Sequence, residues 1–299
     1  MQDFTTHPNR LRPPLLDTLS QKLNFLRKKL ERRVNLLLGR PSTPNAATLS
    51  SMLTSLRFET ESRLSTPITT VGIALPNAAL ESLEEINDAL SYASLNKLGE
   101  ERIPDRELNS AYAAYGYGLC SSYTDPYKCE EEEEVFGLGE RILHLDYTNK
   151  TLAANTGRIS SARETYAETT FADWKLGRDE ASQWEKESDY WEAVKSRIRD
   201  LATTAKRPYT QLLLTGERAA DENFLEVLKD AFSGSNLGNQ VEARREEMDL
   251  TFVVARGAAE LQRRRQQGWL GCVQPMYCSE STLLEKATAK ANQARVLEL

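Results

Sequence analysis

The residue types that most often transfer protons in enzymes are scarce in this chain. It has two histidines, His7 near its start and His144 two positions before Asp146. The segment around His144 alternates apolar and polar residues, which predicts a strand with His144 and Asp146 on the same face. A hydrolase-type pair of these two residues is one interpretation, and a strand histidine with satisfied hydrogen bonds is the preferred one. Because the G-x-S-x-G motif of esterases is also absent, we expect no catalytic residue.

The candidate metal ligands are not spaced as metal sites require. Eight residues separate Cys120 from Cys129, and five separate Cys272 from Cys278, which are not zinc-ribbon spacings. So few cysteines in so long a chain fit a reducing compartment. The five glutamates at 130–134 predict a flexible solvated loop, since a calcium site needs ligands spaced around a glycine bend. We therefore predict no metal site, and we place the boundary between two lobes in this loop.

The composition is that of a globular protein. Hydrophobic residues make up 40% of the 299 residues and charged residues 27%. The net charge of −6 argues against a nucleic-acid-binding protein, whose phosphate contacts need a basic face. No apolar run approaches the ~20 residues that span a bilayer, and the first residues lack the apolar core of a secretory signal. We expect a cytosolic or nuclear protein without a membrane or nucleic-acid partner.

Helical periodicity alternates with short β-type segments along the chain. Leucines at steps of three and four predict a helix over 15–38, with basic residues 27–33 on its solvated face. The alternatives for this helix are a patch for an anionic partner and a coiled coil, which needs about three heptads. A β-branched run closed by Pro76 predicts a strand at 68–75, and 140–157 predicts a strand, a turn and a second strand. Further helices are predicted at 47–64, 78–95, 107–119, 181–204, 250–265 and 280–296. This order indicates an α/β class with mixed sheets.

A leucine-rich strand at 212–214 stops at Thr215-Gly216, and a helical pattern begins a few residues later. The segment LLLTGERAADENFLEVLKDAF (212–232) resembles the adenosine-site segment of the seventy-kilodalton heat-shock chaperones and their actin-like relatives. In that family a glycine turn lies flat against the nucleoside. Four further segments resemble the family in the right order: the strand, proline and helix of the first lobe (69–83), the helix connecting the lobes (109–119), the second phosphate loop (143–152), and a closely packed Gly-Ala-Ala helix (253–264).

The resemblance covers roughly residues 66 to 265, and the whole is similar to divergent chaperone-like proteins of filamentous fungi. It implies an actin-like, ribonuclease H-like two-lobed ATPase-domain fold with an incomplete first lobe. The remnant first lobe would span 1–135, the second lobe with the adenosine-type turn 136–275, and a peripheral helical tail 276–299. The resemblance also implies a site for ATP or ADP with magnesium.

The ATPase motifs of that family are missing or altered in this chain. The first phosphate loop, Asp-x-Gly-Thr, is absent. The second, Asp-x-Gly-Gly-Gly-Thr, keeps Asp146 and Thr151 but has a side chain at every glycine position, where glycine would allow positive φ and close approach to a phosphate. The metal-facing glutamate of the family falls on Asn109, so magnesium loses an anchoring carboxylate. The resemblance leaves as vestigial nucleotide-binding residues Asp146, Thr151, Gly216, Glu217 and Arg218, of which Arg218 matches a residue that stacks near adenine.

These departures predict an inactive ATPase that serves as an interaction module for a protein partner, with at most weak adenine-nucleotide binding. The alternative is an active chaperone-like ATPase whose missing phosphate loop comes from a partner or an absent segment. The peptide-binding domain of the family is not expected, because too few residues follow Arg265 for a β-sandwich of ~100 residues.

Overall fold

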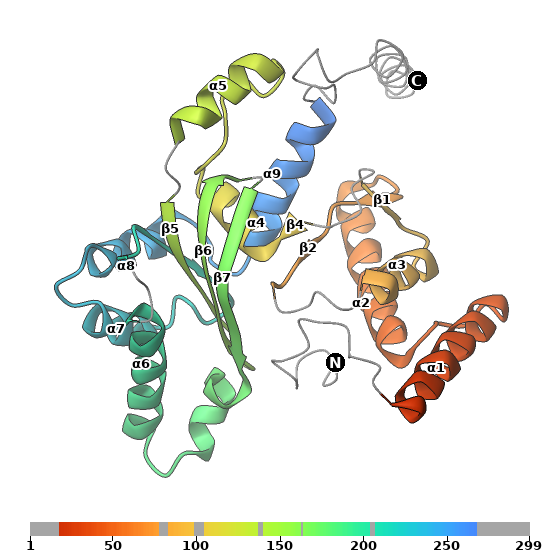
Figure 1. Cartoon of the computed structure of the whole chain (residues 1–299), viewed down its shortest axis with the longest axis horizontal. Helices are drawn as coiled ribbons and strands as arrows, with labels where there is room; N and C mark the ends of the chain where they lie inside the picture. Colours follow the sequence, from red (N-terminus) through yellow and green to blue (C-terminus); the bar gives the residue numbers. More distant parts are fainter. Residues whose placement is uncertain are drawn as a thin grey trace.

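The computed structural model describes residues 18–77, 83–98, 105–136, 140–162, 164–203 and 207–267. Within them the chain is a mixed α/β protein with a four-stranded sheet, two small two-stranded sheets and helices on both sides of the larger sheet (Figure 1). The α/β class with mixed sheets is thus confirmed. The predictions that concern His7, Cys272, Cys278 and the tail at 276–299 lie outside the described residues.

The larger sheet consists of an antiparallel meander and one parallel strand. β5 (Glu140–Tyr147), β6 (Leu152–Ser161) and β7 (Glu164–Asp173) pair in chain order, and β8 (Gln211–Thr215) pairs with β5, giving the order β7-β6-β5-β8. A parallel neighbour requires a crossover connection. Here the crossover contains two 3₁₀ turns, η2 (Trp174–Leu176) and η3 (Arg178–Gln183), and the helix α6 (Glu187–Thr203). The carboxyl ends of β5 and β8 consequently lie side by side.

One face of this sheet packs on α6 and on α7 (Glu222–Ala231). Tyr147, the last residue of β5, stacks on Phe224 of α7 with ring centroids 4.2 Å apart. Its hydroxyl lies 2.8 Å from the hydroxyl of Tyr190 in α6, and all three side chains are fully buried. These aromatic contacts hold the end of β5 against both helices.

The outer edge of β8 is covered by α8 (Asn236–Glu247). The Leu212 amide donates to Gln240 Oε1 at 2.9 Å, and Arg244 Nε donates to the Leu212 carbonyl at 2.8 Å. Side chains of α8 thereby occupy backbone groups that an edge strand would otherwise offer for pairing.

On the other side of the sheet, α4 (Glu107–Ala114) packs against α9 (Val253–Gln267) (Figure 1). A Cβ atom at Gly257 would lie 1.6 Å from the Ser110 carbonyl oxygen, so only glycine allows the two helices to approach this closely. The Tyr115 hydroxyl, just after α4, donates to the Leu214 carbonyl of β8 at 3.0 Å. The close packing expected of the Gly-Ala-Ala helix is therefore present.

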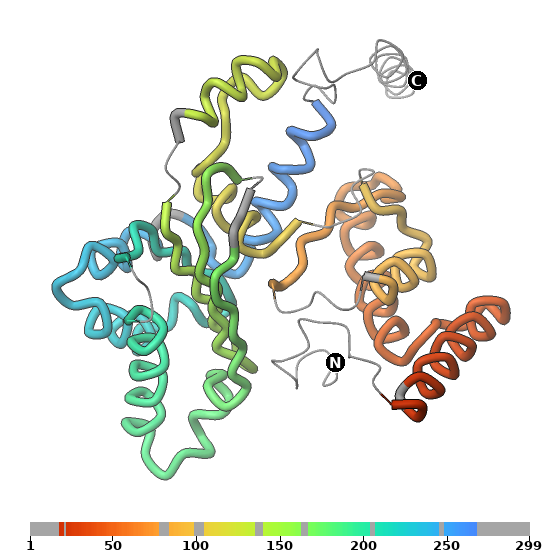
Figure 2. Tube along the Cα trace, viewed as in Figure 1, coloured from red at the N-terminus to blue at the C-terminus, as the bar shows by residue number. Residues whose placement is uncertain are grey.

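The first part of the chain forms a smaller, mainly helical unit. Its helices are α1 (Leu19–Leu37), α2 (Pro44–Leu64) and α3 (Leu83–Tyr92), with a minor core of Leu90, Ala93 and Leu95. Its strands have two residues each: β1 (Thr70–Val71) pairs with β3 (Asn96–Lys97), and β2 (Ala74–Leu75) with β4 (Asp105–Arg106). Figures 1 and 2 show α1 at the edge of the molecule, away from the larger sheet.

Two predicted elements differ from the structure because of glycines. The strand at 68–75 is split into β1 and β2 at Gly72, where a Cβ atom would lie 2.6 Å from the Gln262 side chain of α9. The helix at 107–119 ends at Ala114, since Gly116 and Gly118 adopt φ of +77° and +60°.

The helix predicted at 181–204 also differs from the structure. It begins later, at Glu187, after the 3₁₀ turns.

The prediction of a flexible loop at 130–134 is wrong, because these glutamates belong to the helix α5 (Pro126–Phe136). Asp125 Oδ1 accepts the amides of Tyr127 and Lys128 at 3.2 and 3.3 Å, which caps the helix. The Glu132 carboxylate accepts the amides of residues 121 and 122, so one glutamate ties the helix to the preceding turn.

A disulfide joins Cys120 to Cys129 across the same turn. It differs from the expectation of a reducing compartment, in which such bonds are rare. None of the described helices is long and apolar enough to cross a membrane.

Candidate functional site

The predicted nucleotide-site residues come together at the carboxyl ends of β5 and β8. Asp146 is aligned with Thr215 in the parallel pair, so the turn after β5 and the glycine turn after β8 are neighbours. Glu217 Oε1 accepts the Asn149 amide at 2.9 Å, and Arg218 Nε donates to Asn149 Oδ1 at 2.7 Å. Both side chains therefore reach from the second turn to the first.

In the turn that would hold phosphate, Thr148 to Thr151, every backbone amide already has a hydrogen-bond partner, within the turn or on Glu217. The Thr148 amide donates to the Thr151 carbonyl at 2.9 Å. The Lys150 and Thr151 amides donate to the Thr148 hydroxyl at 3.2 and 3.0 Å, and the Asn149 amide donates to Glu217. The threonine hydroxyl thus folds the turn back on itself.

The backbone conformation of this turn also departs from that of a glycine loop. Among the described residues other than glycine, only Ser65 and Ser94 have positive φ. Thr148, Asn149 and Lys150 consequently stay outside the left-handed region that glycine permits. The outer side of the turn is held as well, because Asp179 and Arg178 donate their amides to its carbonyls.

Gly216 is required by the protein itself. It adopts φ of +106°, and a Cβ atom there would lie 2.3 Å from the Tyr147 carbonyl oxygen. The Gly216 amide donates to the Leu250 carbonyl and the Arg218 amide to the Tyr147 carbonyl, both at 3.0 Å. The glycine therefore lets the chain cross the end of β5 and needs no ligand to explain it.

A buried chain of hydrogen bonds runs behind these turns. The Asn155 side-chain amide lies 3.0 Å from His144 Nδ1, and His144 Nε2 lies 2.8 Å from the Thr215 hydroxyl. The Thr215 hydroxyl donates to Asp146 Oδ1 at 2.8 Å. This direction of donation assigns the neutral Nε2–H tautomer to His144. Burial lowers the pKa of His144 to about 3, so the imidazole stays neutral near pH 7.

Glu107, at the start of α4, completes the cluster and was missed in the sequence analysis. Its Oε2 lies 3.4 Å from the Asn155 amide nitrogen and its Oε1 4.0 Å from His144 Nε2. Burial, and next the negative charge of Asp146, raise the pKa of Glu107 to about 8. Burial also raises the pKa of Asp146, against the hydrogen bond from Thr215. Asn109, which the resemblance matches to the family's metal-facing glutamate, donates to the Ala162 carbonyl at 2.9 Å.

This cluster does not support nucleophilic catalysis. The hydroxyl of Thr215 has a histidine partner, as a nucleophile would need, but Thr215 and His144 are buried and already bonded on both sides. The preferred interpretation of His144, a strand histidine with satisfied hydrogen bonds, is confirmed. In a second cluster, Cys120, Cys129 and Glu133 lie close enough to hold a metal ion, but the disulfide occupies both sulfurs.

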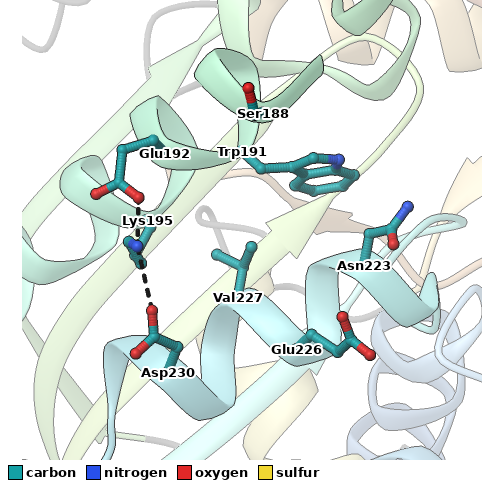
Figure 3. A pocket seen from close by; sticks show the side chains of 8 residues that line it. All are labelled: Ser188, Trp191, Glu192, Lys195, Asn223, Glu226, Val227 and Asp230. Carbon is teal, nitrogen blue, oxygen red and sulfur yellow. Dashed lines mark ion pairs between the residues drawn. The ribbon is translucent and has the colours of Figure 1, made fainter. Parts of the chain in front are cut away.

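A shallow groove of about 370 Å³ lies elsewhere, between α6 and α7 (Figure 3). Trp191 and Val227 form its apolar part, and three carboxylates line it. Its lysine, Lys195, is paired with Glu192 and with Asp230. The groove therefore has an excess of negative charge and suits a phosphate ligand poorly.

No protein-family model matches this chain, and comparison with curated proteins finds no match either.

Proposed function

We propose that this chain is a vestigial actin-like ATPase module of the type found in the seventy-kilodalton heat-shock chaperones. It would no longer hydrolyse ATP and would act by binding a protein partner. The two-lobed ribonuclease H-like arrangement, with an incomplete first lobe over 1–135 and a second lobe over 136–275, is part of this proposal. Its support is the adjacency of the turn at 148–151 to the glycine turn at 216, and the tight crossing of α4 and α9 at Gly257.

The observation that carries the proposal is the closed turn from Thr148 to Thr151. Phosphate loops bind by donating several free backbone amides to one phosphate. Here a phosphate would have to displace the Glu217 carboxylate from Asn149 and the Thr148 hydroxyl from two further amides. Because preorganised donors supply most of the rate enhancement in such sites, their loss predicts an inactive ATPase.

The charges around the turn oppose a triphosphate as well. The Glu217 carboxylate lies against the turn, and the lysine of the turn, Lys150, is already paired with Asp179 at 2.8 Å. Magnesium would offset the repulsion in the family. In this chain Glu107 would be a poor magnesium anchor, since a carboxyl group with a pKa of about 8 is mostly protonated at pH 7.

Thermal unfolding of the full chain with adenosine, Mg-ADP or Mg-ATP at millimolar concentration tests this proposal, combined with a phosphate-release assay. A ligand that binds the folded state raises the melting temperature. We expect no phosphate release and no larger shift with Mg-ATP than with adenosine. A shift with adenosine that disappears in Arg218→Ala, but persists in Glu130→Ala on the exposed side of α5, would show remaining adenine contacts.

Two results would refute the proposal. Release of phosphate by the purified chain, abolished in Asp146→Asn, would establish the alternative of an active ATPase. A shift with Mg-ATP well above that with adenosine would show that the turn at 148–151 opens to accept phosphates.

A further inference from the structure

The helix α1 is attached to the molecule by its polar side. Arg32 donates from Nε and Nη2 to the two carboxylate oxygens of Asp88 in α3, at 2.6 and 2.9 Å, and also pairs with Glu84. The Asn35 side chain donates to the Ser42 carbonyl at 3.3 Å. The ion pair lowers the pKa of Asp88 and raises that of Arg32, as a structural contact should.

The opposite side of α1 exposes a continuous row of apolar side chains. Successive helical residues are rotated by about 100°, so Leu30 lies about 200° from Arg32 and faces away from α3. The exposed fractions along this row are large: Leu19 77%, Leu23 59%, Leu26 59%, Leu30 63% and Leu37 87%. We call these five residues the leucine seam. Exposed apolar rows of this extent mark interaction surfaces.

The spacing of the leucine seam is that of a coiled coil. Its members follow steps of four, three and four residues, and Arg33 occupies the remaining core position between Leu30 and Leu37. Over residues 19–32 the apolar residues on this side occupy only the two core positions of each heptad and make a narrow stripe, which Val34 and Leu36 widen near the end of the helix. A helix lying in a membrane surface has a broad apolar face along its whole length. The partner expected from this geometry is another helix, with an acidic side chain opposite Arg33.

The charged residues that flank the leucine seam are all basic, and the other flanking positions hold Ser20, Val34 and Leu36. Lys22 and Lys29 lie on one flank and Arg27 on the other, at the positions that choose the partner in coiled coils. No ion pair joins Lys22 or Lys29 to another described residue, and Arg27 pairs with Glu31 of the same helix. A second copy of α1 would place these like charges against each other, so the flanks disfavour self-association.

From these observations we infer that α1 is a docking helix for an acidic amphipathic helix of a partner protein, which would cover the leucine seam. The inference names the partner class for the interaction role proposed above and rests on that proposal for its meaning in the cell. The tests of this inference use no nucleotide, so the proposed inactive ATPase and the proposed docking helix can be refuted independently of each other.

The direct test is binding of the full chain to a labelled synthetic helix, followed by fluorescence anisotropy. The probe has about three heptads with leucine at both core positions, glutamate at both flanking positions and one glutamate opposite Arg33. We expect saturable binding that weakens as ionic strength rises from about 50 to 500 mM. A second probe with lysine in place of each flanking glutamate should bind at least ~10-fold more weakly.

Three variants distinguish binding at the leucine seam from nonspecific hydrophobic binding elsewhere on the surface. L23Q/L30Q should weaken binding of the acidic probe at least ~10-fold, since two buried leucine contacts are lost. L56Q, which changes an exposed leucine of α2 instead of α1, should bind like the unmodified chain. K22E/K29E should reverse the preference between the two probes. All of these side chains are exposed, so circular dichroism should confirm unchanged folding.

Other occupants of the leucine seam would give different results. A dimer in sedimentation that dissociates in L23Q/L30Q would mean that a second copy covers the seam, which would overturn the inference. Tighter binding to phosphatidylserine vesicles than to the acidic probe would assign the seam to a membrane surface. Equal binding of both probes, or of neither, would also contradict it.

Discussion

Replacement of Glu107 by glutamine tests the electrostatics of the buried cluster most directly. The structure places this carboxyl group beside Asp146 in the interior, and its pKa rises from an ordinary 4.5 to about 8. The folded protein then binds a proton that the unfolded chain has released, so the free energy of unfolding falls as pH rises between these two values. The loss begins near pH 4.5 and is complete above about pH 8.

The magnitude follows from the gap between the two pKa values. Each pH unit of that gap is worth about 1.36 kcal/mol, which sets an upper limit of about 5 kcal/mol for the destabilisation by Glu107 at high pH. The proton is shared electrostatically with Asp146, so the titration belongs to the pair and the observed loss is smaller. We expect at least ~2 kcal/mol.

Urea unfolding followed by tryptophan fluorescence, repeated from pH 5 to pH 9, measures this effect. Glutamine keeps the shape of the protonated acid but cannot ionise, so E107Q should gain stability relative to the unmodified chain as pH rises. Titrations of groups distant from Glu107 occur in both proteins and largely cancel in the difference, whereas that of Asp146 is part of the measured effect. E226Q, at an exposed glutamate of α7, is the matched control and should show a constant difference. A constant difference for E107Q as well would refute a proton on Glu107 at neutral pH.

Three further predictions concern backbone geometry and the disulfide. G216A should lower the free energy of unfolding by at least ~2 kcal/mol, because it adds a Cβ clash to a positive φ. Gly234 also has a positive φ but has open space around it, so G234A should lower the free energy of unfolding by only about 1 kcal/mol. Equal losses for the two variants in urea unfolding would contradict this. G257A should destabilise the chain by at least ~2 kcal/mol through separation of α4 and α9, and an unchanged melting temperature would show that the helices do not cross there. C120A should lower the free energy of unfolding by about 2–3 kcal/mol through loss of the disulfide to Cys129. This difference should vanish when both proteins are reduced with dithiothreitol. If reduction does not change the stability of the unmodified chain, the disulfide does not form.

Elements defined by a strong local pattern were predictable from the sequence. The hairpin of β5 and β6 alternates apolar and polar residues, and β8 is a short leucine run that ends on a glycine. The helix predicted at 47–64 is α2, which begins three residues earlier because Thr43 caps it and Pro44 stands in its first turn. In each case the interactions that define the element lie within a few residues of one another.

β7 and α5 were missed because distant or non-apolar contacts define them. β7 is an outer strand with little apolar alternation, and its formation depends on the ladder to β6. The run of glutamates in α5 suggested repulsion, but a cap at Asp125 and the tie from Glu132 to the preceding turn outweigh it.

The candidate site shows the same division. Asp146, Thr151, Gly216, Glu217 and Arg218 were selected by a resemblance between motifs, and the parallel pairing of β5 and β8 brings their turns together. The same resemblance places the family's metal-facing glutamate at Asn109, but the sequence contains no signal that Glu107, two residues earlier, would be buried beside Asp146. That neighbourhood depends on how α4 lies against the sheet.

The sequence alone determined the α/β class, the short strands with strong local patterns and the absence of glycine from the turn at 148–151, because these depend on residue types at fixed spacings. Only the tertiary structure decided that the amides of the turn at 148–151 are already occupied, that a buried acid retains its proton, and that the leucine seam of α1 faces outward. Hydrogen-bond partners, burial and exposure depend on segments that are distant in the chain, so they cannot be inferred from a local sequence pattern.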